Sequence, residues 1–108
     1  MRIVNKDEFM KLPDGTIYSL YKPCFFTGLF RKGENCNAED YYEMSLIGNV
    51  KCESSVDMAE ILLAKEADST SFELEFDCEG RNGMFESEQL YAIYESKDIS
   101  GLIKTLEG

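Results

Sequence analysis

The strongest pattern along the chain is an unbroken alternation of apolar and acidic residues between Ser71 and Glu79. Side chains two positions apart lie on the same face of a β-strand, so this segment is predicted to be one half-buried strand. The predicted buried face consists of Phe72, Leu74, Phe76 and Cys78. The predicted solvent face, which we call the acidic row, consists of Glu73, Glu75, Asp77 and Glu79.

Short helices and strands joined by tight turns are predicted for the rest of the chain. Asn5 is a favourable helix N-cap, and Glu8 completes a capping-box pattern, so a first helix should end at the turn over residues 13–15. Alternating apolar and polar residues predict further strands over residues 16–21, 24–32, 41–52 and 90–94.

Two longer helices and one hairpin complete the predicted fold. Ser54 and Ser96 are favourable helix N-caps, and each precedes apolar residues at helical spacing. The Asn82-Gly83 pair predicts a hairpin between the acidic strand and residues 90–94. We therefore expect an α+β fold, with a mostly antiparallel sheet of about five strands and two or three short helices packed on one side.

The length and charge of the chain restrict the functions that it could have. Its 108 residues are expected to form one acidic domain, residues 1–108, with a net charge of −10. Residues 1–33 hold six basic and three acidic residues, a net charge of +3, whereas residues 34–95 hold three basic and sixteen acidic residues, a net charge of −13. Direct binding to nucleic acid requires basic patches, so we expect instead a partner protein with a basic surface.

The sequence also indicates where the protein acts. It has no apolar stretch of the length that a membrane span needs, and residues 1–8 lack the apolar core of a signal peptide. We therefore expect no membrane contact and a cytoplasmic location.

Residues that support catalysis or metal binding are scarce. Histidine is absent, and no glycine-rich phosphate-binding motif occurs. No two cysteines have the close spacing of a zinc chelate, and all except Cys36 are expected to be small core residues. We therefore predict that the protein is not an enzyme and binds no cofactor and no metal.

Carboxylates and tyrosines are the candidate binding groups. The acidic row could equally be a solvated strand face that discourages aggregation. Adjacent residues Tyr41 and Tyr42 must face opposite sides of a strand, so some tyrosines should lie outside the core, at a rim or an interface. The candidate partner-binding residues are Glu73, Glu75, Asp77, Glu79, Glu86, Glu88, Glu43 and Tyr41.

Two segments resemble small uncharacterised accessory proteins of phages and prophages. The first is residues 8–18, and the second begins with Arg-Asn-Gly-Met-Phe at 81–85 and ends with Leu-Tyr-Ala-Ile-Tyr at 90–94. They cover about a quarter of the chain and carry over no catalytic residue. The resemblance implies a mobile-element setting, where small acidic proteins often inhibit host defence or nucleic-acid enzymes.

These features predict a non-enzymatic phage-type accessory protein that binds another protein. We expect it to be an acidic inhibitor that docks on a basic, nucleic-acid-binding surface of a host defence protein. The alternative is a small structural or ligand-binding phage module that forms a homodimer through an exposed tyrosine-rich strand.

Overall fold

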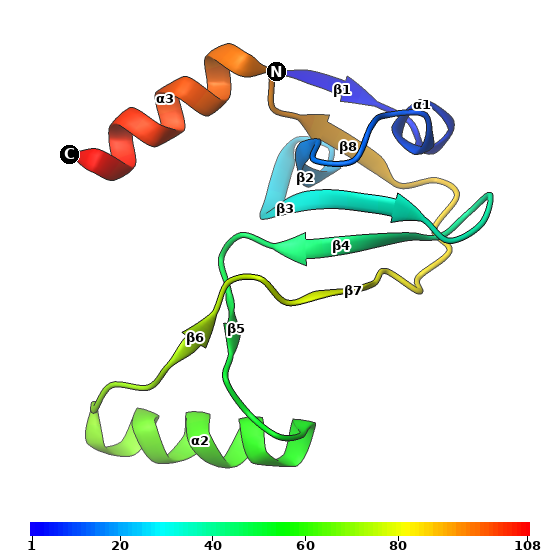
Figure 1. Cartoon of the computed structure of the whole chain (residues 1–108). Helices are drawn as coiled ribbons and strands as arrows, with labels where there is room; N and C mark the ends of the chain where they lie inside the picture. Colours follow the sequence, from blue (N-terminus) through cyan, green and yellow to red (C-terminus); the bar gives the residue numbers. More distant parts are fainter.

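A computed structural model describes the whole chain, residues 1–108 (Figure 1). The elements in chain order are β1 (Arg2–Val4), α1 (Lys6–Met10), β2 (Ile17–Lys22), β3 (Phe25–Asn35), β4 (Tyr41–Ser45), β5 (Asn49–Val50), α2 (Ser55–Asp68), β6 (Leu74–Glu75), β7 (Glu79–Arg81), β8 (Leu90–Ile93) and α3 (Ser96–Glu107).

Six strands form the main sheet, in the order β1-β8-β2-β3-β4-β7, and all neighbouring strands in it are antiparallel. The strands β5 and β6 form a separate two-stranded antiparallel sheet. The expected α+β fold with a mostly antiparallel sheet is therefore confirmed. β1 was not predicted, because three residues are too few to show a period.

An aromatic cluster between α1 and the main sheet forms the core. Phe9 of α1 stacks on Tyr91 of β8, with ring centroids 3.8 Å apart, and meets Tyr18 and Tyr41 edge-on at 4.7 and 4.9 Å. All four side chains are almost completely buried. The predicted cap positions α1, since the Asn5 side chain accepts a hydrogen bond from the Glu8 N–H at 2.9 Å.

The long strand predicted over residues 41–52 is divided into β4 and β5. A turn at residues 46–48 separates them, and Gly48 has a φ of +94°, which a residue with a side chain rarely adopts. A Cβ on Gly48 would also lie 3.0 Å from the Phe76 ring. The chain therefore leaves the main sheet after Ser45.

The prediction of a single acidic strand over residues 71–79 is also wrong. Its first part becomes β6, which pairs with β5, and its last part becomes β7, which pairs with β4. The Asn82-Gly83 hairpin does not form either, because β7 and β8 are not neighbours in the sheet. The Gly83 N–H instead donates to the buried carboxylate of Asp40 at 2.9 Å.

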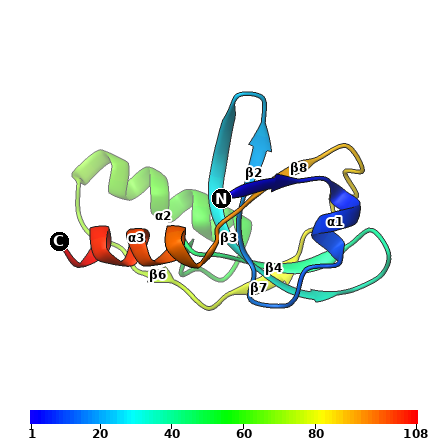
Figure 2. The same ribbon diagram turned by 90° about the horizontal axis from the view of Figure 1, so that it is seen from above.

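Two parts of the chain project from the main sheet: in Figure 1 one lies below the sheet and the other extends to its left, and in the view from above in Figure 2 both extend to the left. One is residues 46–78, which contain β5, α2 and β6 and which we call the arm; the other is α3. Among the helices, α1 packs on the sheet, where Phe9 stacks on Tyr91, and no residue of the arm or of α3 is buried. The radius of gyration is accordingly 15.8 Å, against about 13 Å for a compact chain of this length.

Candidate interaction surfaces

Local sequence signals explain how the arm is built. The Ser54 hydroxyl caps α2 by accepting from the Asp57 N–H at 3.1 Å, as predicted from the sequence. β5 and β6 pair through Asn49 with Glu75 and Val50 with Leu74. α2 ends at Ser69, a C-cap in the left-handed conformation.

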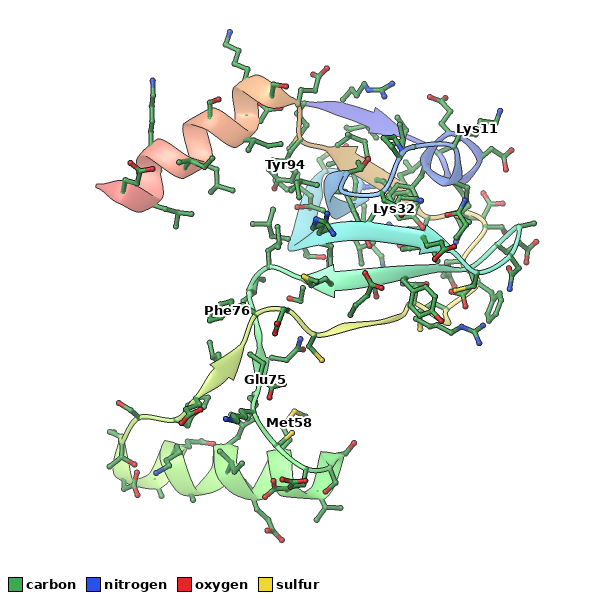
Figure 3. All side chains as sticks on the ribbon, viewed as in Figure 1. Lys11, Lys32, Met58, Glu75, Phe76 and Tyr94 are labelled. Carbon is green, nitrogen blue, oxygen red and sulfur yellow. The ribbon has the colours of Figure 1, made fainter.

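The arm leaves many large apolar side chains in solvent. They are Ile47, Val56, Met58, Leu62, Leu63, Phe72, Leu74 and Phe76. Phe72, Leu74 and Phe76 are 43%, 44% and 59% exposed, so the prediction that they form a buried strand face is wrong. Alternation fixes which side chains share a face, but burial requires an element that covers the face, and the main sheet does not reach it. Figure 3 shows Met58, Glu75 and Phe76 on the arm, away from Lys32 in the core.

The arm is also strongly acidic, with eight carboxylates and two lysines between residues 46 and 78, a net charge of −6. Glu73 and Glu75 line a shallow hollow of about 450 Å³ together with Glu53, Asp57 and Lys51, among others. The ion pair between Lys51 Nζ and Glu73 Oε2, at 3.3 Å, is solvent-exposed and therefore weak. The local excess of negative charge is largely unneutralised.

The structure separates the eight candidate residues into groups. Glu73, Glu75 and Asp77 lie on the arm, although Glu75 is half-buried. Glu79 is exposed on β7, an edge strand of the main sheet. The two remaining exposed carboxylates, those of Glu86 and Glu88, lie on the loop between β7 and β8. The acidic row is therefore not a continuous ladder.

Glu43 and Tyr41 hold the fold together instead of facing a partner. Glu43 accepts hydrogen bonds from the Tyr18 hydroxyl at 2.7 Å and from the Asn82 side chain at 3.2 Å. Tyr41 is 0% exposed and its hydroxyl donates to that of Tyr91 at 3.3 Å, so its assignment as a partner-binding residue is wrong. Burial raises the pKa of Tyr18 and Tyr41, and the Glu43 carboxylate raises them further.

Sequence reasoning missed two buried lysines beside the aromatic cluster. Lys32 Nζ lies 5.7 Å from the centre of the Phe9 ring and donates to the Asn35 side chain at 2.8 Å. Lys6 is 6% exposed, and its Nζ lies 5.1 Å from the centre of the Tyr41 ring without a hydrogen-bond partner. Burial lowers the pKa of both lysines. Nothing in the local sequence distinguishes them from surface lysines.

A second hollow lies between the main sheet and the loop before β8. Its volume is about 370 Å³, and Tyr41, Tyr91, Leu20, Met84 and Glu86 are among its lining residues. Lys22 also lines it and offsets the charge of Glu86. This hollow therefore lacks the excess of negative charge that the arm carries.

The four cysteines are free and exposed. This agrees with the expectation for Cys36, whereas the burial predicted for Cys24, Cys52 and Cys78 is wrong. The structure brings together no group of three or more cysteine, aspartate or glutamate side chains suited to a metal ion. None of its helices has the length and apolar character required to cross a membrane.

Comparison of the chain with family models, curated proteins and solved structures found no match.

Proposed function

We propose that this protein is a non-enzymatic accessory protein, of the kind that phages encode, and that its arm binds another protein. The observation that supports this best is that the arm combines eight exposed large apolar side chains with a net charge of −6 and buries no residue of its own. An exposed apolar patch that is bordered by charged residues is typical of protein interaction sites. A partner that covers the arm would remove this apolar surface from water.

The chemistry of the arm favours a basic partner surface. The carboxylates of Glu73, Glu75 and Asp77 lie among exposed apolar side chains, so the fitting surface is one with lysines and arginines around apolar contacts. Surfaces that bind nucleic acid carry such basic residues, because they must neutralise phosphates. We therefore propose that the arm occupies a nucleic-acid-binding surface of a host protein and inhibits it by excluding the nucleic acid.

The test is a kinetic comparison of the wild type with a variant in which Glu73→Gln, Glu75→Gln and Asp77→Asn are combined. Host proteins that a nucleic-acid column retains are passed over the immobilised wild type at low salt, and a captured protein serves as the partner. The variant should associate with it about tenfold more slowly at low salt, with a flatter dependence on ionic strength. Wild-type protein should also displace a fluorescent duplex from this partner.

A matched control combines Glu79→Gln, Glu86→Gln and Glu88→Gln, which removes the same number of charges from exposed positions outside the arm. Its association rate should stay close to that of the wild type. Equal losses in both variants would show that only the net charge matters and would contradict docking through the arm. Failure to displace the duplex would contradict inhibition but not binding.

The alternative, a homodimer through an exposed tyrosine-rich strand, has less support. Tyr18, Tyr41 and Tyr91 are fully buried, and Tyr21, Tyr42 and Tyr94 are half-buried. No strand therefore offers a set of exposed tyrosines.

A further inference from the structure

The second hollow is lined by one face of the main sheet and by the loop between β7 and β8 (Figure 1). Leu20 of β2 lies directly opposite Thr27 of β3 and Tyr91 of β8, so these three side chains share one sheet face. Met84 of the loop also lines the hollow and is 68% exposed. The volume of about 370 Å³ lies within the range of about 300–1,000 Å³ that small-molecule sites occupy. The hollow therefore has the size of a ligand site.

Hydrogen bonds fix this loop at both of its ends. At the first end, the Asn82 N–H donates to the Tyr41 carbonyl at 2.9 Å, and the Asn82 side chain donates to Glu43 at 3.2 Å. At the other end, the Gln89 side chain donates to the carbonyl of Tyr21 at 3.1 Å. The hollow is therefore pre-formed, as small-molecule sites usually are.

Two polar side chains of the lining carry hydrogen-bonding groups that the protein does not use. Tyr91 is 1% exposed, and its hydroxyl accepts from the Tyr41 hydroxyl at 3.3 Å but donates to no protein atom. Both hydrogens of the Gln89 amide are donated, to the carbonyls of Tyr21 and Leu90, but its oxygen accepts no hydrogen bond. A ligand that accepts from Tyr91 and donates to Gln89 would satisfy both groups.

The charges of the lining favour a neutral ligand. Lys22 and Glu86 are both exposed and take part in none of the ion pairs of the structure, so the hollow carries one charge of each sign. An anionic ligand would meet Glu86 in a chain of net charge −10, which has no glycine-rich loop to bind a phosphate. A cationic ligand would meet Lys22.

The apolar part of the lining indicates the shape of the ligand. Leu20, Met84, Tyr41 and Tyr91 supply this apolar part. A heteroaromatic ring system matches the lining, since its faces are apolar and its edge carries hydrogen-bond donors and acceptors. A cavity of about 150 Å³ can hold benzene, so about 370 Å³ is enough for two fused rings. We propose that the second hollow binds a neutral purine base. This site is distinct from the arm and adds a small-molecule ligand to the proposed protein binding.

The experiment is a titration of the full chain with adenine, followed by amide NMR spectra. Binding should be saturable, with shifts at Leu20, Thr27 and Met84 and none on the arm. The affinity should not change when the salt concentration is raised, because the ligand is neutral. Adenosine monophosphate should bind about tenfold more weakly, because Glu86 and the net charge of −10 repel its phosphate. Indole, which has no acceptor in its rings, should bind several-fold more weakly than adenine.

Met84→Ala should weaken adenine binding about tenfold, because it removes an apolar side chain and its sulfur from contact with the ring. The matched control is Met58→Ala on the arm, at a residue that is 40% exposed, and it should leave the affinity unchanged. Both methionines are exposed, so both variants should retain the fold. Thr27→Phe is an independent variant at an exposed strand position, and its ring should fill the hollow and abolish binding. A lack of saturable shifts, an equal loss in Met58→Ala, or tighter binding of the nucleotide than of adenine would each overturn the proposal.

Discussion

Phe9 is the residue on which the core should depend most. It is 0% exposed, stacks on Tyr91 at 3.8 Å and meets two further rings, Tyr18 and Tyr41, edge-on. Truncation of a large aromatic side chain in a packed core costs about 3–5 kcal/mol. Each aromatic pair contributes about 0.5–1.5 kcal/mol beyond the area it buries, so Phe9→Ala should lie at the upper end of this range. A chain of this size is stabilised by only about 5–15 kcal/mol in total.

Urea unfolding, followed by circular dichroism, measures this effect. Phe9→Leu retains much of the side-chain volume but loses the ring contacts, so it should cost clearly less than Phe9→Ala. The control is Phe76→Ala on the arm, at a residue that is 59% exposed, where the loss should be about 1 kcal/mol or less. If Phe76→Ala destabilised the protein as much as Phe9→Ala, the arm would be part of the folded core and not a separate, exposed part of the chain.

Two further predictions concern charged groups in the sheet. The Gly83 N–H and the Arg81 guanidinium lower the pKa of Asp40, so Asp40→Asn should lower the urea midpoint at pH 7. A lowered carboxyl pKa stabilises the folded state at pH values above the unfolded-state pKa of about 3.9. The difference in urea midpoint between Asp40→Asn and the wild type should therefore be complete at neutral pH and disappear as the pH falls through the folded-state pKa of Asp40. A difference that does not depend on pH would contradict the role of the charge. Lys6→Met should stabilise the protein by about 1 kcal/mol at pH 7, since the cost of burying an ammonium without a hydrogen-bond partner outweighs its contact with the Tyr41 ring and its attraction to nearby carboxylates such as Asp40. Since burial lowers the pKa of Lys6, the gain in stability from Lys6→Met should shrink as the pH rises towards 10. A loss of stability in the same urea assay would show that the contact with Tyr41 outweighs the cost of burying the ammonium.

The sequence predicted several features that depend on neighbouring residues, although the N-cap of α3 is Glu95 and not Ser96. Asn5 caps α1 and Ser54 caps α2 because a cap involves only the first turn of its own helix. The strands that pair as β2, β3 and β8 also lie close to their predicted positions. Each of these signals is contained within a few residues, so no knowledge of the tertiary structure was needed.

Features that depend on distant residues were missed. The alternation from Phe72 to Cys78 is real, but the segment changes its partner from β5 to β4 and is never covered. Gly83 is not part of a hairpin, and its N–H donates to Asp40, which lies 43 positions away in the sequence. Tyr41 is buried because Phe9 and Tyr91 meet it in the core. No local pattern contains these partners.

The distribution of contacts explains why binding and stability can be altered separately in this protein. The aromatic cluster and the contacts of Asp40 all lie in the main sheet, α1 and the loops that join them. The arm and α3 bury no residue, so their side chains contribute little to the free energy of folding. Substitutions on either of them can therefore change affinity without unfolding the sheet. Because the arm is acidic, salt should weaken its contacts with a basic partner much more than it affects the buried aromatic contacts of the sheet.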